Sequence, residues 1–348
     1  MASAQLSWEE VATSKDDKPS LPRSGHVAAA LPATHSHDVI IFGGYVEDEQ
    51  KGREAANDAW TFSLASGKWE EVKYTSEEVP RVRLASQAVV VGQHLWLIAG
   101  WDPGHNKDGG DILSDLWRLD LNTMAWKQIS PEGEQMPQIS RFQAQAIGSR
   151  IYIHTHRSLQ DILVLDVSDS NAPTLSLQPV TSDPEPPMSR GLHSLTAVGE
   201  DLVLFAGAPK EGPMLGDLWA LHTGSASWQE LDAEGRTPHV RCSQAVAAAD
   251  SDVFVFGGSY YKNEGGLQPL NDLIVLDTKE MQWRYSKLAD GSGPLPRNAA
   301  TLTRVGDKLV LYGGWNPFVE TYNDTHVMDV SGVSSMLKDF PLDPEEDW

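Results

Sequence analysis

The sequence contains one cysteine, no long apolar run and no apolar leader, and each scarcity argues against a class of protein. Cys242 alone forms no internal disulfide, which favours a reducing compartment over a secretory one. No segment approaches the roughly 18 uninterrupted apolar residues that a membrane-spanning helix needs. Residues 1–20 include four carboxylates and lack the apolar core of a signal peptide. We therefore expect a soluble cytosolic protein, with the nucleus as the alternative location.

Positive charge is also scarce, because 27 basic residues face 49 acidic ones and the formal net charge is −22. This charge repels phosphate backbones and anionic lipid surfaces, so neither a nucleic acid nor a membrane is expected as a partner. Hydrolase, zinc-protease and phosphate-loop motifs are missing from the sequence. His154 and His156 lie close together without an accompanying cysteine or carboxylate motif. We therefore predict neither a metal site nor a cofactor.

Repetition is the dominant feature of the sequence. Six aspartates each begin a run of alternating apolar residues, which is typical of a strand, and two of these runs begin at Asp161 and Asp324. In the other four copies a tryptophan follows the aspartate by 11 residues: Asp58 and Trp69, Asp115 and Trp126, Asp217 and Trp228, and Asp272 and Trp283. The chain therefore contains six copies of one unit.

A second apolar segment precedes each aspartate and ends in small residues. These segments are 39–44, 95–100, 151–155, 202–207, 253–258 and 309–314. Three of them end in a glycine doublet, which permits a positive φ and the close approach of two backbones. Runs rich in alanine and valine precede these segments, and small side chains suit a strand beside a narrow central axis. Each unit is predicted to form four antiparallel strands over about 50 residues.

The glycine doublet, the aspartate and the later tryptophan together resemble the Kelch-repeat family from Trp8 to Asp329. The resemblance implies an all-β, six-bladed Kelch propeller with four antiparallel strands in each blade. It predicts one domain over 1–334, followed by an acidic tail over 335–348. The predicted blades are 24–74, 84–130, 142–180, 191–232, 242–288, and 298–330 joined by 6–12. Propellers of this kind perform unrelated tasks, so the fold alone does not fix the function.

The N-terminal strand is predicted to complete the sixth blade. Ser335 stands where the sixth tryptophan would fall, whereas Trp8 has no aspartate run before it. Trp8 also precedes Arg23 by 15 residues, close to the interval between tryptophan and arginine in other units. Joining the two ends in one sheet closes the ring and removes an exposed edge.

A basic residue precedes the innermost strand of every unit: Arg23, Arg83, Arg141, Arg190, Arg241 and Arg297. If the units superpose, these arginines form a ring at one mouth of the central channel, although Arg141 departs from the common spacing by about two residues. Guanidinium groups bind carboxylates with two parallel hydrogen bonds, so we predict that the ring binds an acidic segment of a protein or peptide. In some Kelch proteins the equivalent arginines contact acidic peptides. The alternative is that each arginine pairs internally with an aspartate such as Asp58 or Asp217.

Long loops between the second and third strands are predicted on one face in units one, two and five. With the loop of unit six, they carry four further candidate binding residues: Trp101, His105, Tyr260 and Trp315. Packing against neighbouring blades is the alternative role for Trp101 and Trp315.

These features predict a monomeric, non-catalytic binding module that acts as an adaptor or scaffold. The rival hypothesis is a small-molecule enzyme or modifier in the central pocket, similar to the plant specifier proteins of the same family. The iron site that this resemblance implies is absent, because its Glu, Asp and His positions hold Ser259, Asn263 and Leu267.

Overall fold

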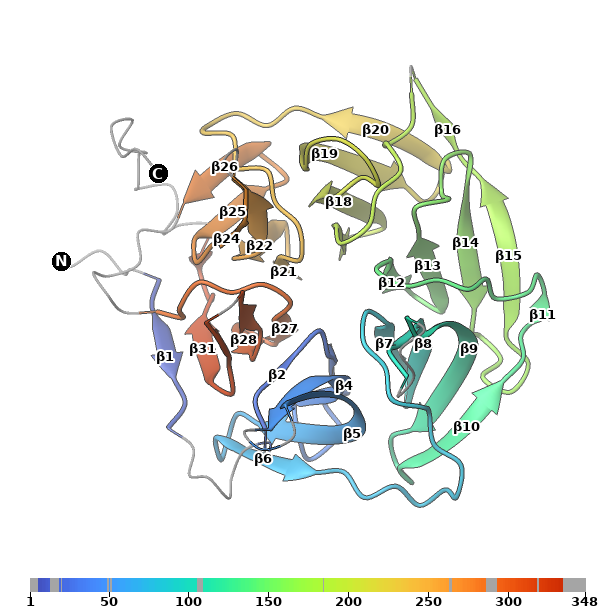
Figure 1. Cartoon of the computed structure of the whole chain (residues 1–348). Helices are drawn as coiled ribbons and strands as arrows, with labels where there is room; N and C mark the ends of the chain where they lie inside the picture. Colours follow the sequence, from blue (N-terminus) through green and yellow to red (C-terminus); the bar gives the residue numbers. More distant parts are fainter. Residues whose placement is uncertain are drawn as a thin grey trace.

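Six β-sheets surround one axis as the blades of a propeller (Figure 1). The structure is a computed structural model that describes residues 6–12, 19, 21–48, 50, 52–104, 109–183, 185–262, 265–285, 293–317 and 319–333. Within these ranges no helix has the length and apolar character needed to cross a bilayer. The all-β, six-bladed fold predicted from the repeats is confirmed.

The blades are numbered in chain order, and their strands are given from the axis outward. Blade 1 contains β3 (Val27–Ala30), β4 (Val39–Asp48), β5 (Gly52–Ser63) and β6 (Lys68–Glu71). Blade 2 contains β7 (Gln87–Val91), β8 (His94–Asp102), β9 (Asp111–Asp120) and β10 (Ala125–Ile129). Blade 3 contains β12 (Gln143–Ile147), β13 (Arg150–His154), β14 (Asp161–Asp166) and β15 (Thr174–Pro179).

Blade 4 contains β17 (Ser194–Val198), β18 (Asp201–Gly207), β19 (Leu215–His222) and β20 (Ser227–Leu231). Blade 5 contains β21 (Ala245–Ala249), β22 (Asp252–Phe256), β25 (Leu273–Asp277) and β26 (Gln282–Tyr285). Blade 6 contains β27 (Thr301–Val305), β28 (Lys308–Tyr312), β31 (Thr325–Asp329) and β1 (Trp8–Glu10).

Short strands extend several blades. β2 (Arg23–Ser24) pairs with β4, while β11 (Glu132–Gly133) and β16 (Thr181–Ser182) run parallel to β15 and β20. Two small hairpins lie between the second and third strands of blades 5 and 6: β23 (Ser259–Tyr261) with β24 (Leu267–Pro269), and β29 (Trp315–Asn316) with β30 (Glu320–Thr321).

The hydrophobic cores lie between neighbouring blades. Between blades 1 and 2, for example, Phe42 meets Trp126 edge to face with ring centroids 5.5 Å apart, and Leu97 belongs to the same cluster. Buried clusters of this kind occur at all six boundaries between blades. Because alternating side chains of a strand face opposite neighbours, each blade contributes to two cores, and the ring is stabilised by packing between blades.

The glycine doublets lie where the second strand meets the next blade. Gly44 has a φ of +89°, and a Cβ atom there would lie 2.6 Å from the His26 backbone nitrogen. The pairing of β4 with β5 shifts register between Phe42 and Gly44, as in a β-bulge. The two roles predicted for the doublet, a positive φ and close backbone approach, are both confirmed at this position.

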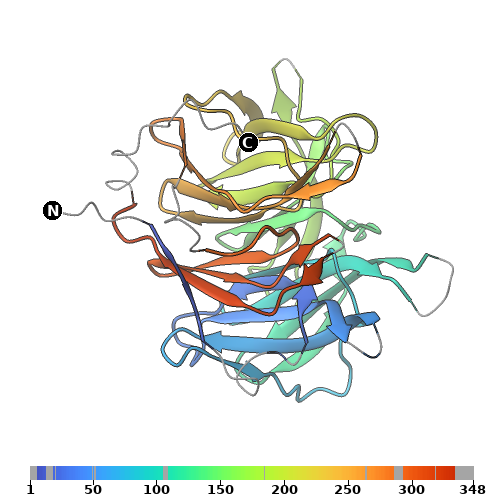
Figure 2. The same cartoon turned by 60° about the vertical axis from the view of Figure 1, so that its left-hand side comes forward.

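β1 is the outermost strand of blade 6 and pairs antiparallel with β31, placing Trp8 opposite Met328 (Figure 2). The Trp8 side chain is buried and meets Phe256 of blade 5 at a centroid distance of 5.6 Å. Leu6 is buried in the same cluster. A segment from the N-terminus therefore contributes both hydrogen bonds and core side chains to the last blade.

Candidate functional site

Five of the six predicted arginines lie inside the blades, with at most 1% of the residue exposed. Each guanidinium donates two hydrogen bonds of 2.5–2.9 Å to both carboxylate oxygens of an aspartate that lies within the third strand or directly precedes it. The pairs are Arg23 with Asp58, Arg83 with Asp115, Arg190 with Asp217, Arg241 with Asp272, and Arg297 with Asp324. None of these arginines lines the central cavity. The internal pairing left open by the sequence is therefore observed, and these five are removed from the candidate binding residues.

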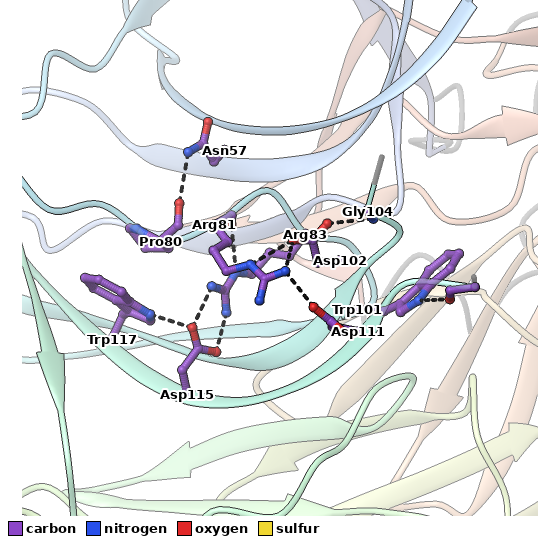
Figure 3. A network of polar contacts seen from close by, with 11 residues as sticks. Asn57, Pro80, Arg81, Arg83, Trp101, Asp102, Gly104, Asp111, Asp115 and Trp117 are labelled. Atoms are coloured by element: carbon purple, nitrogen blue, oxygen red, sulfur yellow. Dashed lines mark hydrogen bonds and ion pairs between the residues drawn. The ribbon is translucent and has the colours of Figure 1, made fainter. Parts of the chain in front are cut away.

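In four of the five pairs the surroundings favour the carboxylate form, because the pKa of Asp58, Asp115, Asp217 and Asp324 is held below the ordinary value. Although burial alone raises the pKa of Asp115, the hydrogen bonds and charge of Arg83 hold it below the ordinary value (Figure 3). Trp117 donates its indole N–H to the same carboxylate at 2.7 Å. The same tryptophan contact recurs in blades 1 and 4, and His326 replaces the tryptophan in blade 6. Each aspartate therefore connects the third strand of its blade to the arginine-bearing segment that precedes the first strand of the same blade.

Replacing Arg241 with isoleucine is expected to lower the free energy of unfolding by about 3–5 kcal/mol. The Asp272 side chain is only 6% exposed, so the substitution leaves a buried carboxylate without its counter-ion. Arg23→Ile is the matched comparison, because Asp58 is 32% exposed and regains hydration more easily. Urea denaturation of both variants would measure the difference. Equal losses would contradict the dependence on burial of the remaining carboxylate.

Blade 3 lacks the buried pair, and the predicted alignment of Arg141 is wrong by two residues. Ile139 occupies the arginine position, since its carbonyl accepts a 3.0 Å hydrogen bond from Gly100 as the carbonyl of Arg83 accepts one from Gly44. Arg141 instead has a φ of +57° and aligns with the residues that follow the other arginines by two. Its side chain lines the central cavity and has no hydrogen-bond or ion-pair partner within the described residues.

The innermost strands surround a cavity of about 800 Å³ on the propeller axis. Its described lining includes three arginines, Arg53, Arg141 and Arg304, and neither aspartate nor glutamate. Arg304 lies near the strand turns at one end and bonds to Asp250 at 3.2 Å. Arg53 and Arg141 lie at the opposite end, where the loops between second and third strands form the mouth. A locally positive mouth thus occurs in a chain with a net charge of −22.

Aromatic rings hold Arg53 at this mouth. Its guanidinium lies 4.8 Å from the ring centroids of both Tyr45 and Trp315, and it donates a 3.0 Å hydrogen bond to Ser24. Tyr45 in turn meets Trp101 edge to face at 6.4 Å. These contacts form a row of side chains across blades 2, 1 and 6, made of Trp101, Tyr45, Arg53 and Trp315. The row holds the Arg53 guanidinium in place beside the cavity.

The four predicted loop residues have different outcomes. Trp101 and Trp315 line the cavity with Arg141, and the Trp101 indole also donates to the Gly109 carbonyl at 3.0 Å (Figure 3). Tyr260 is not part of the lining, because its ring stacks on His239 at 3.7 Å, and Tyr261 lines the cavity instead. His105 lies outside the described residues.

Comparison with known proteins agrees with this architecture. The family model described as the KLHDC2/KLHL20/DRC7 Kelch-repeats domain matches residues 1–155 and again residues 154–334. The chain belongs to the Kelch-repeat family. Its resemblance to that family, first indicated by the glycine, aspartate and tryptophan pattern, is thereby confirmed.

Several curated relatives share this Kelch region. Kelch domain-containing protein 3 of Rattus norvegicus is 24% identical over 335 residues, which cover 89% of this chain and 84% of the relative. Acyl-CoA-binding domain-containing protein 4 of Arabidopsis thaliana is 27% identical over 253 residues, covering 69% of this chain and 36% of the relative. Acyl-CoA-binding domain-containing protein 6 of Oryza sativa is 32% identical over 193 residues, covering 51% and 28%. The match therefore spans about a third of the acyl-CoA-binding relatives.

Two buried histidines, His26 and His193, line the Kelch cavity, and a third, His154, is buried next to His193. His154 Nδ1 lies 3.0 Å from His193 Nε2, while His26 bonds to the Thr301 hydroxyl at 2.9 Å. Burial, reinforced by the charges of nearby arginines, lowers the pKa of both His26 and His154 to about 3. Burial also holds the pKa of His193 well below its ordinary value. His154 thus pairs with His193 rather than His156, and the described residues contain no group of three metal-binding side chains.

Two mouth residues of the Kelch propeller, Tyr45 and Arg53, were missed by the sequence analysis. The sequence predicts a loop over 45–57, whereas β4 and β5 continue through this segment as paired strands. Arg53 of β5 lies opposite Glu47 of β4, and Glu47 follows Tyr45 by two residues. Because side chains alternate along a strand, Tyr45 and Arg53 point to the same side of the sheet. The strand alternation, if continued beyond the glycine doublet, predicts that both side chains face the mouth.

Proposed function

We propose that this Kelch propeller is a non-catalytic interaction module that binds an acidic segment of a partner protein at the mouth of the axial cavity. The observation that carries the proposal is the described cavity lining, which contains arginines and no carboxylate in a strongly acidic chain. The positive charge at the mouth attracts an anionic group, whereas the acidic surface elsewhere repels it. The mouth is therefore the favoured position for such a group.

The side chains at the mouth suit a peptide carboxylate. Arg141 has no internal partner among the described residues, and its planar guanidinium matches a carboxylate in a bidentate arrangement. Arg53 is held between two rings, which reduces the conformational freedom lost on binding. Trp101 and Trp315 add aromatic surface beside these charges, a combination enriched at energetically important interface positions.

A small-molecule enzyme in the same cavity is the second hypothesis, and the cavity volume falls within the range of small-molecule sites. Cys242 is the thiol in the lining, but burial raises its pKa and reduces the thiolate available as a nucleophile. The side chains at the mouth therefore support binding more directly than covalent chemistry. We also propose that the protein is a monomer, since its net charge opposes self-association. The cytosol is its proposed location, because a single cysteine favours a reducing compartment.

Arg141→Glu is expected to weaken partner binding at least about tenfold, because it places a like charge against the acidic segment. Arg150→Glu is the matched control, since it makes the same change in blade 3 on an exposed side chain at the start of β13. Affinity capture with the wild type and both variants would identify proteins whose recovery depends on Arg141. Calorimetry with the purified partner and a synthetic copy of its acidic segment would then measure affinity.

Binding that is unchanged in Arg141→Glu, or reduced equally in Arg150→Glu, would contradict the proposed site. Recovery of a metabolite or metal ion without any protein would favour the enzyme hypothesis. Raising the salt concentration should weaken wild-type binding more than binding by Arg141→Glu, because screening acts on the contact that the variant removes.

A further inference from the structure

The exposed large apolar side chains of the described residues gather on the face that contains the mouth. Seven of the eight lie at the loop ends of second or third strands or in segments that join consecutive blades: Ile112, Leu159, Met188, Val240, Tyr261, Leu295 and Val319. These positions share one face, because in each antiparallel blade the second strand ends where the third begins and where the fourth ends. The eighth residue, Leu177, lies on the outer strand β15. Apolar exposure concentrated on one face marks an interaction surface.

The buried arginines fix part of this surface from below. Arg190 donates a 2.8 Å hydrogen bond from Nε to the Met188 carbonyl, and Arg297 makes the equivalent 2.9 Å bond to Leu295. Met188 and Leu295 are nevertheless 57% and 55% exposed. Their backbones are thus anchored while their side chains face solvent. Such preorganisation lowers the entropic cost of association.

Six of these side chains follow one another over blades 3 to 6, and contacts between segments join two pairs of them. The Ser189 hydroxyl donates to the His156 carbonyl at 2.6 Å, which joins the Met188 segment to the loop containing Leu159. The Tyr322 hydroxyl donates to the Pro296 carbonyl at 3.2 Å, which joins the Leu295 segment to the loop of Val319. We call this set of six side chains the apolar rim, and it comprises Leu159, Met188, Val240, Tyr261, Leu295 and Val319.

Blades 1 and 2 present a different surface on the same face. There Arg81 takes the position equivalent to Met188 and bridges Asp102 and Asp111 (Figure 3). The β8 and β9 hairpin that carries these aspartates projects beyond the ring (Figure 2). The face therefore has one side with a projecting hairpin, which carries the ion pairs of Arg81 together with Ile112, and an apolar side over blades 3 to 6.

We infer that the apolar rim is a second contact surface for the same partner, and that this partner is a folded protein of neutral or positive net charge. This inference rests on the proposed function, because the acidic segment in the mouth is taken as part of that partner. A peptide confined to the cavity leaves an arc over four blades bare, whereas a folded surface burying about 800 Å² on each side covers mouth and rim together. A second copy of this chain is disfavoured, since each copy carries a charge of −22.

The test compares Met188→Glu/Leu295→Glu with Leu177→Glu. All three positions are exposed, so the variants are expected to fold, and Leu177 is 46% exposed away from the rim. Affinity capture identifies the protein whose recovery requires Arg141, and calorimetry then uses that purified protein and its synthetic acidic segment as separate probes. The double variant should weaken binding of the whole partner at least about tenfold and leave binding of the segment unchanged. Leu177→Glu should change neither affinity.

Each other result counts against the inference. If Arg141→Glu weakens the whole partner and the double variant does not, the proposed function stands and the rim is excluded. If the synthetic segment binds as tightly as the whole partner, the folded contact is likewise excluded. If the wild type self-associates and the double variant does not, the rim binds a second copy instead. If no captured protein depends on Arg141, both the proposed function and the inference fail.

Discussion

Deleting residues 1–12 is expected to lower the free energy of unfolding by about 5 kcal/mol or more, far beyond the effect of deleting 335–348. The first deletion removes the buried Trp8 and Leu6 side chains and the whole of β1. Truncating one buried tryptophan already costs about 3–5 kcal/mol, and the lost strand pairing adds to this value. Chemical denaturation and the melting temperature of both truncated chains would measure the difference.

Trp8→Ala separates the two contributions, because it keeps β1 while removing the ring that packs on Phe256. Its loss of stability should fall between those of the wild type and the 1–12 deletion. The deletion should also increase aggregation, since it exposes the backbone edge of β31. Equal melting temperatures for the two truncations would show that the N-terminal strand contributes little to the ring. Residues 335–348 lie outside the described structure.

Acidification from pH 7 to pH 5 is expected to lower the free energy of unfolding by about 2 kcal/mol for each of His26 and His154. Both have a folded pKa of about 3, below the ordinary value of 6.5, because burial disfavours their charged form. Between these two pKa values the unfolded chain binds protons that the folded chain does not, so the free energy of unfolding decreases as the pH is lowered. Well above pH 6.5 both states are neutral and the effect disappears. His193 adds a loss of the same sign.

His154→Phe/His193→Ser should reduce this acid sensitivity. The pairing of Phe42 with Val27 and of His154 with Gln143 shows that these two side chains occupy equivalent positions, and Ser86 is the equivalent of His193. The double variant therefore copies a combination present elsewhere in the ring. Urea denaturation at several pH values would give the slope of stability against pH. An unchanged slope would contradict the assignment.

His222→Gln is the control for this experiment. His222 is partly exposed, and the hydrogen bonds that its ring donates to the Gln229 side-chain oxygen and the Asp201 carboxylate raise its pKa. A raised folded pKa contributes stability at low pH, so replacing His222 should not reduce the loss on acidification. The dependence on burial would be refuted if both replacements flattened the slope equally.

The fold was predictable because its signals are local and repeated. The interval between Asp115 and Trp126 recurs in four units, and Gly44 is required by a backbone approach that only a missing Cβ permits. These features depend on a few consecutive residues, and six copies make chance agreement improbable. The arrangement of blades follows from the same period.

The site was only partly predictable, because its chemistry depends on which distant groups meet. The sequence supplied both Arg83 and Asp115 but left open whether the guanidinium bonds to that carboxylate or to a ligand. At Arg141 the arginine itself misled the alignment, since Ile139 fills the structural position and the arginine is displaced towards the cavity. His154 and His193 come from different blades, so their contact required the packing between blades.

The pairing of β1 with β31 also determines how this propeller can be joined to other domains. Both flanking segments, before Leu6 and after Val333, start at the outer edge of blade 6, where these two residues share one core cluster. The mouth lies on the axis, inside the ring of innermost strands. A domain fused on either side would therefore be joined through residues of blade 6 that belong to one core cluster. Such tethering starts away from the mouth and beside the blade 6 end of the apolar rim.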